Sequence, residues 1–204
     1  MQFKDSEIAH KYLDGLKGIE IGGSAHNPFH LDTINVDYTD DMETIYKKGE
    51  FELCGEKMPV DVIAYGDDLP FEDEEYDFVI SSHVMEHFFD PIKALKEWYR
   101  VIKKGGYIFI IAPTHYSLPG EIRPCTTLKE LIDRHKGKIK PEDVDMGNNV
   151  YPPTGEKMGN DHGHFSVWDL ADFLEICEYL KMNVVEKLEA DDKVGNGFCV
   201  LIQK

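Results

Sequence analysis

Residues that could do chemistry stand at several points of this 204-residue chain, each directly after a short apolar run. Glu20 lies near the end of the first run, and the glycines Gly22 and Gly23 follow it. Because glycines have no Cβ, they let a ligand approach the backbone closely. The doublet by itself is equally compatible with a tight surface turn. Asp37 closes the second run, and in nucleotide-binding folds an acid at that place accepts hydrogen bonds from ribose hydroxyls.

Two further corners follow the third and fourth apolar runs. The third corner carries Asp67 and Asp68 in front of Leu69, and the fourth carries Ser82 and His83. Ligands of doubly wound sheets bind outside the carboxyl ends of the strands, so these corners would line one edge of the sheet. Any one corner could be an ordinary solvated loop, but their coincidence predicts a ligand site at that edge.

The elements that position these corners follow from the alternation of β-like runs with helical periodicity. We expect one α/β domain over residues 1–204, with a Rossmann-like, doubly wound, mostly parallel seven-stranded sheet and an antiparallel C-terminal strand. The expected strands are 18–21, 33–36, 60–64, 76–81, 107–112, 184–188 and 198–202. The expected helices are 5–16, 40–48, 91–102 and 166–180, with a further one near 127–135.

Two segments interrupt this alternation. Only about a dozen residues separate Gly22 from the second strand. A crossover with its helix usually needs at least about 10–12 residues, so this segment is at the minimum and too short for a full helix. We therefore expect a loop or one short turn at 26–29. From 114 to 165, prolines punctuate a polar stretch without clear periodicity, which predicts an insertion that forms a functional site.

The composition excludes several classes of function. The net charge of −17 disfavours nucleic acid and anionic membrane surfaces as partners. The apolar runs are too short to span a membrane, and the N-terminus shows no signal-peptide pattern, so we expect a cytoplasmic protein. The four cysteines are scattered and are expected to be free thiols. The pair His162 and His164 could ligate a metal, but a loop lacks a helix's fixed geometry, so no metal site is assigned.

One block of the sequence resembles a known family. Residues 69–87 read LPFEDEEYDFVISSHVMEH, and the chain continues through Asp90-Pro91 to RVIKKGGY at 100–107. This block is similar to the middle of class I S-adenosylmethionine-dependent methyltransferases of the type 11 kind. The resemblance is close over residues 17–113 and extends to the C-terminus through the helix–strand–strand ending. It implies S-adenosylmethionine as the methyl donor.

The resemblance implies a donor site built from the four corners. The methionine end of the donor would meet the first and fourth corners, the ribose the second, and the adenine the third. The residues so assigned are Glu20, Gly22, Gly23, Ser82 and His83 for the methionine end, Asp37 for the ribose, and Asp67 or Asp68 with Leu69 for the adenine. The chain departs from the family where Ser24-Ala25-His26 replaces a third glycine, so Asn27 or His26 is expected to hold the donor's carboxylate.

The histidines and the insertion suggest the acceptor side. Methyl transfer from a sulfonium needs nucleophile, methyl and sulfur in line, and a base if the nucleophile is a hydroxyl. His115, directly after the fifth strand, is the best-placed base, and His83 and His164 are the other candidates. The residues expected to bind the acceptor are His115, Glu121, Arg123 and His162.

The expected function is methyl transfer from S-adenosylmethionine to a small-molecule or sugar-like acceptor, with oxygen slightly preferred as the nucleophile. Two alternatives stay open. A nicotinamide-dependent oxidoreductase is disfavoured because no GxGxxG run opens a helix after the first strand. A non-catalytic donor-binding module is mildly disfavoured by His115, Arg123 and His164 in the insertion.

Overall fold

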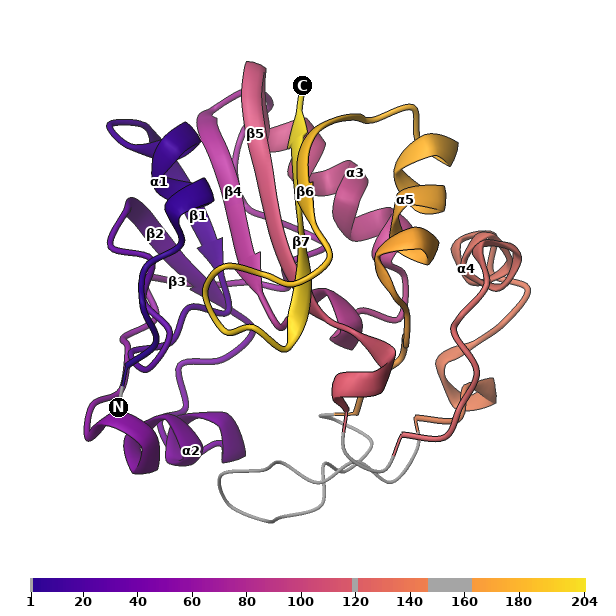
Figure 1. Cartoon of the computed structure of the whole chain (residues 1–204), viewed down its shortest axis with the longest axis horizontal. Helices are drawn as coiled ribbons and strands as arrows, with labels where there is room; N and C mark the ends of the chain where they lie inside the picture. The colour runs from indigo at the N-terminus through magenta and orange to yellow at the C-terminus, as the bar shows by residue number, and fades with distance from the viewer. Residues whose placement is uncertain (1, 119–120, 147–162) are drawn as a thin grey trace.

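The computed structural model describes residues 2–118, 121–146 and 163–204, which contain a seven-stranded sheet (Figure 1). The strands are β1 (Lys17–Ile21), β2 (Asp32–Asp37), β3 (Val62–Ile63), β4 (Tyr76–Ser82), β5 (Ile102–Pro113), β6 (Asn183–Leu188) and β7 (Gly197–Gln203). Their order in the sheet is β3-β2-β1-β4-β5-β7-β6. Strands β1 to β5 pair in parallel, and β7 pairs antiparallel with both β5 and β6. The predicted sheet and its antiparallel ending are confirmed.

Two strands differ in length from the prediction by more than two residues. Strand β3 is shorter than the expected 60–64, since only Val62 and Ile63 pair with β2. Strand β5 begins earlier than the expected 107–112, because Ile102 already pairs with Tyr76 before the register shifts. The two glycines expected to stop the preceding helix, at 105–106, therefore lie inside β5.

The described helices are α1 (Glu7–Leu13), α2 (Ile45–Cys54), α3 (Pro91–Val101), α4 (Leu128–His135) and α5 (Leu170–Tyr179), with 3-10 turns η1 (Met85–His87), η2 (His115–Ser117) and η3 (Pro141–Asp143). Helix α3 starts as predicted, with the Asp90 side chain accepting a hydrogen bond from the Lys93 amide and with Pro91 in the first turn. In the described part of the chain, no helix combines the length and apolarity needed to cross a bilayer.

Two helices start four or five residues later than predicted. Residues 40–44 lie outside α2, because the Thr44 hydroxyl caps that helix by accepting from the Lys47 amide. Helix α5 does not start at Ser166. Its capping box is formed by Asp169 and Asp172, while the buried Ser166 hydroxyl accepts a hydrogen bond from Arg134.

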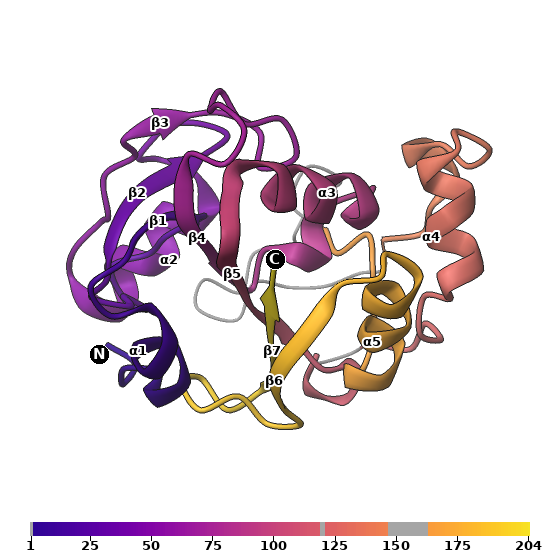
Figure 2. The same ribbon diagram turned by 90° about the horizontal axis from the view of Figure 1, so that it is seen from above.

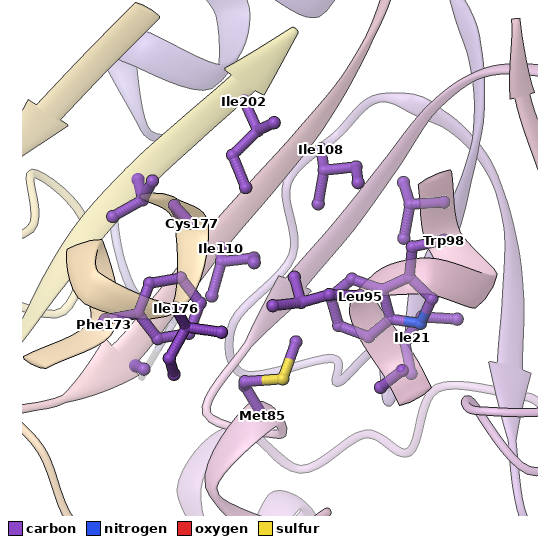
Figure 3. Close-up of a cluster of buried hydrophobic side chains, with 14 of the residues drawn as sticks. Ile21, Met85, Leu95, Trp98, Ile108, Ile110, Phe173, Ile176, Cys177 and Ile202 are labelled. Atoms are coloured by element: carbon purple, nitrogen blue, oxygen red, sulfur yellow. The ribbon is translucent and has the colours of Figure 1, made fainter. Parts of the chain in front are cut away.

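The two faces of the sheet are covered differently (Figure 2). Helices α3 and α5 cover one face, where Leu95, Trp98 and Phe173 meet strand residues such as Ile110 in a buried apolar cluster (Figure 3). The other face is covered by α1 and by the loop after β1, whose Phe29 packs edge-on against Phe109. The second face thus has a loop where a crossover helix would otherwise lie.

The connection from β1 to β2, which is described throughout, contains no helix. The short-loop prediction for 26–29 is therefore confirmed. Lys193, in the β6–β7 connection, contacts this loop. Its ammonium donates to the Pro28 carbonyl and lies 4.6 Å from the centroid of the Phe29 ring. Contacts from distant segments replace the stabilisation that a helix would supply.

Candidate active site

The strand order reverses between β1 and β4, from which successive strands extend in opposite directions. Ligands of doubly wound sheets bind at such a point, outside the carboxyl ends of the strands. Gly22 and Gly23 follow β1 there, and His83 follows β4. The first and fourth predicted corners are therefore neighbours in the structure.

Gly22 is required by the backbone. Its φ is +67°, a conformation that other residues rarely adopt, and its amide donates to the Val36 carbonyl at 2.8 Å. A Cβ on Gly22 would lie 2.7 Å from a methyl carbon of Val84. The close turn after β1 therefore depends on the missing side chain.

Gly23 is held by Asn35, a residue that the sequence analysis did not assign. The Asn35 side-chain oxygen accepts from the Gly23 amide at 2.9 Å, and its nitrogen donates to the Pro59 carbonyl at 2.6 Å. A Cβ on Gly23 would lie 2.7 Å from that oxygen and 2.8 Å from the Met58 sulfur. The available signal was a polar residue in an otherwise apolar strand.

A buried ion pair from α2 also supports the loop after β1. The Glu50 carboxylate accepts from the backbone amides of Ala25 and Met58. The Lys47 ammonium lies 3.0 Å from Glu50, and the two side chains are only 6% and 1% exposed. Both residues stand in a highly charged part of the sequence, where nothing distinguishes them from surface residues. This pair was therefore missed.

Asn27 connects the first corner to the fourth. Its side-chain nitrogen donates to the Ser82 hydroxyl at 3.0 Å. Its side-chain oxygen is buried and has no hydrogen-bond partner among the described residues. An unpaired buried acceptor of this kind is costly unless a ligand donates to it.

The second and third corners lie along the same edge of the sheet. Asp37 ends β2, accepts from the Tyr38 amide at 2.7 Å, and has a pKa raised by burial. Asp67 pairs with Lys93 at 3.1 Å, while Asp68 is exposed. Leu69 is buried in the core beside α3, and its amide donates to Glu97. The assigned adenine contacts stay predictions.

Glu20 is deeply buried. Its carboxyl accepts from the Thr33 hydroxyl at 3.3 Å, and burial raises its pKa to about 7. With Asn35 it lines a pocket of about 200 Å³, to which Phe29 also contributes. The carboxyl therefore lies below the glycine turn, on the face of the sheet that the loop covers.

Four residues form a polar group on the acceptor side, which we call the His–Glu cluster: His83, Glu86, His87 and His164. Glu86 Oε1 lies 3.9 Å from His83 Nδ1 and 3.9 Å from His87 Nε2. The rings of His87 and His164 meet edge to face with their centroids 4.7 Å apart. From the sequence, His87 is expected to be a packed or hydrogen-bonded structural histidine, and its Nδ1 does contact the Gly163 carbonyl.

Burial keeps His83, Glu86 and His164 of this cluster uncharged at neutral pH. It raises the pKa of Glu86 to about 8 and lowers the pKa of His83 to about 4. The pKa of His164 falls to about 2, chiefly because of burial and further because the neighbouring His87 and Arg123 disfavour a positive charge beside them. Neutral imidazoles can accept a proton, so His83 and His164 are in the form that a base requires.

Two of the insertion residues assigned to the acceptor, Glu121 and Arg123, contact each other. Arg123 forms two hydrogen bonds to the Glu121 carboxylate, at 2.9 and 2.6 Å, and a third to the His164 carbonyl at 2.9 Å. The Glu121 side chain is only 1% exposed. These contacts position His164, and binding of the acceptor by the pair stays a prediction.

His115 lies in a second group rather than in the His–Glu cluster. One ring nitrogen of His115 lies within 4.8 Å of a potential metal-ligand atom of Cys125 and of one of Asp169. Its amide donates to Asp169 at 3.1 Å, at the start of α5. His162, the remaining assigned residue, lies outside the described residues.

Comparisons with known proteins concern the family and the fold. Residues 22–110 match the family described as methyltransferase domain, of type 11. An uncharacterized protein of Methanocaldococcus jannaschii is 36% identical over 119 residues, which are 53% of this chain and 54% of that protein. The 2-methyl-6-phytyl-1,4-hydroquinone methyltransferase 1 of rice (Oryza sativa subsp. japonica) is 28% identical over 114 residues, which are 53% of this chain and 34% of that protein. The matched region thus spans about half, or less, of these relatives.

Among solved structures, a SAM-dependent methyltransferase from Methanosarcina mazei superposes with a TM-score of 0.56 at 16% identity. It covers 98% of this chain and 99% of its own. At that identity the likeness concerns the fold.

The described residues fit S-adenosylmethionine, the donor that the family implies. The unpaired Asn27 oxygen would accept from the ammonium of its methionine portion, and the half-buried Asp37 would accept from its ribose hydroxyls. The turn at Gly22 would bring the backbone close to the methionine portion. Residues 22–110 therefore match the type 11 methyltransferase domain, and the chain has the fold of the S-adenosylmethionine-dependent methyltransferases.

Proposed function

We propose that the protein transfers the methyl group of S-adenosylmethionine to an oxygen of a small hydroxylated acceptor. The observation that carries the proposal is the hydrogen bond from Asn27 to Ser82, since it joins two donor-binding corners directly beside the His–Glu cluster. The donor supplies an activated methyl on its sulfonium, so this chain's residues need only orient the reactants and take up the acceptor's proton.

We assign the base to His83. It follows β4 directly, is neutral at pH 7, and its Nε2 has no hydrogen-bond partner among the described residues. During transfer the acceptor hydroxyl would give its proton to His83 as its oxygen bonds to the methyl carbon, and the carbon–sulfur bond would break. His164 and His115 are the alternative bases that the sequence suggested.

The acceptor class rests on less direct support. The insertion at 114–165 is proposed to form the acceptor site, because His164 and Arg123 reach the His–Glu cluster from it. The matched rice relative is named for a hydroquinone, which supports a small hydroxylated molecule. A sugar-like acceptor has the same reactive group and is the second class to test.

Ligand binding tests the donor half of the proposal. S-adenosylhomocysteine should raise the melting temperature by mass action, whereas NADH should not. A shift with NADH alone would favour the oxidoreductase alternative, although the absence of a helix after Gly22 removes the usual pyrophosphate site. If neither compound shifts the melting temperature, both the methyltransferase and the oxidoreductase function are excluded.

Turnover tests the second half. Incubation with radiolabelled S-adenosylmethionine and panels of hydroquinones, catechols and sugars should transfer label to at least one acceptor. Donor binding without transfer to any panel member would instead support the non-catalytic donor-binding module.

A further inference from the structure

Three side chains of the His–Glu cluster have the composition of a metal site. One ligand atom from each of Glu86, His87 and His164 lies within 4.8 Å of the other two. Two imidazoles and one carboxylate suit first-row divalent metals, and catalytic zinc sites use such a set with one position left open. We propose that Glu86, His87 and His164 bind a divalent transition-metal ion, with Zn²⁺ as the ion that fits this set best.

The Glu86 carboxyl gives the first independent support. Its residue is 1% exposed, and its Oε2 has no hydrogen-bond partner among the described residues. A buried carboxyl oxygen without a partner is unfavourable, and the charged form of the group is more so. A bound cation would supply the missing partner.

The orientation of His87 gives the second. Its Nδ1 lies 3.2 Å from the Gly163 carbonyl, which can only accept, so Nδ1 carries the hydrogen. In the neutral ring the lone pair is then on Nε2, the atom that lies 3.9 Å from Glu86. Metal-binding histidines are commonly fixed in this way, with the second nitrogen donating to a carbonyl or a carboxylate.

The backbone around His164 is also held in place. Arg123 donates to the His164 carbonyl at 2.9 Å, and the Ser166 amide donates to the Glu86 carbonyl at 3.1 Å. The second bond joins the segment that contains His164 to η1, which contains the other two ligands. Ligands about 2.0–2.1 Å from a tetrahedral ion lie ~3.3 Å apart, so binding would draw the ligand atoms together by at most about 1.5 Å.

An ion at this place would also deepen the proposed reaction. His83 lies 3.9 Å from Glu86, so the site adjoins the donor corner. On the proposed function, the open position would bind the acceptor's hydroxyl oxygen and lower its pKa, and His83 would receive the proton. Metal binding itself can be measured without donor or acceptor, so the two proposals can fail separately.

A second group of potential ligands, His115, Cys125 and Asp169, is less suitable. Both Asp169 oxygens are used, one by the His115 amide at 3.1 Å and the other by the Tyr116 hydroxyl at 2.9 Å. Burial raises the pKa of the Cys125 thiol to about 12, whereas a metal binds the thiolate. This group provides a matched control.

The test is a Co²⁺ titration of the full chain after treatment with a chelator. One equivalent should bind with the visible absorption of four- or five-coordinate Co²⁺, and Zn²⁺ should displace it. Glu86→Gln and His87→Asn should weaken binding by about 100-fold or more, since loss of outer-shell partners alone costs about 10–100-fold. Cys125→Ser should bind as the original protein does.

Circular dichroism and the S-adenosylhomocysteine melting shift would show that each variant is folded. Glu86→Gln keeps the shape of the buried side chain, so it is the stricter test. Undiminished Co²⁺ affinity in folded Glu86→Gln, or a sulfur-to-cobalt charge-transfer band that Cys125→Ser abolishes, would overturn the assignment. Absence of any stoichiometric binding would do the same.

Discussion

The donor side and the acceptor side of the candidate site are assembled in different ways. On the donor side, Gly22, Asp37 and Ser82 each stand at or directly after the end of a strand, so the sheet alone brings them together. On the acceptor side, the contact between His87 and Gly163 joins residues 76 positions apart. Strand ends recur in any sheet of this topology, whereas a contact of this kind depends on how one particular insertion folds back.

The supporting contacts differ as well. The glycine loop on the donor side is supported by the Lys47–Glu50 pair, in which both side chains are almost fully buried. On the acceptor side the corresponding pair, Arg123–Glu121, keeps the arginine 14% exposed. We therefore expect donor binding to depend on the buried residues that support the glycine loop. We expect the chemistry on the acceptor side to depend on single histidine side chains.

The largest expected effect concerns the base. His83→Asn should lower turnover by about 10²–10⁴-fold with donor affinity nearly unchanged, because general-base catalysis contributes on that scale. Asparagine is chosen because His83 has a φ of +56°, which asparagine tolerates. Steady-state kinetics would be compared with those of His115→Ala. A loss of turnover confined to His115→Ala would place the base in the second group.

Removal of the buried pair should have the next largest effect. Glu50→Ala should lower the free energy of unfolding by about 3–5 kcal/mol, since it leaves the Lys47 ammonium buried without an opposite charge. Urea denaturation measures this change. The control is Lys129→Ala, in an exposed pair with Asp133, which should leave stability unchanged. Equal stability of Glu50→Ala and the original protein would show that the donor frame does not depend on α2.

Asp37→Ala should weaken S-adenosylhomocysteine binding by roughly 100-fold while the fold survives, because two charge-assisted hydrogen bonds to the ribose would be lost. Isothermal titration calorimetry gives the affinity. The affinity of Asp37→Asn should lie between those of Asp37→Ala and the original protein. An unchanged dissociation constant would place the ribose contact elsewhere.

The last expected effect depends on pH. Because the pKa of Glu20 is raised to about 7 in the folded protein, its contribution to stability is fully present below the unfolded value of 4.5 and is lost as the pH rises through 7. Glu20→Gln should remove this dependence and gain at most about 3 kcal/mol relative to the original protein at pH 8, with little gain at pH 4. Urea titrations at pH 4 and pH 8 measure the gain in stability of Glu20→Gln. A gain of equal size at both pH values would contradict the prediction.

Much of the fold could be predicted because its signals are local. The Asp90 cap, Pro91 and the apolar stripe define α3, and the short segment after Gly22 excluded a crossover helix. The errors arose where local signals compete: Ser166 and Asp169 are both good caps, and only burial of Ser166 against Arg134 separates them.

The sequence by itself determined which functional residues stand at the end of each strand: glycines after β1, an acid at the end of β2, and a serine and a histidine at the end of β4. The tertiary structure decided which other residues reach these corners. Asn35 and Glu50 hold the glycine loop, and Glu86 meets His164 beside β4. Their roles depend on burial and on long-range contacts, which set the charge and partners of a side chain and leave no local pattern in the sequence.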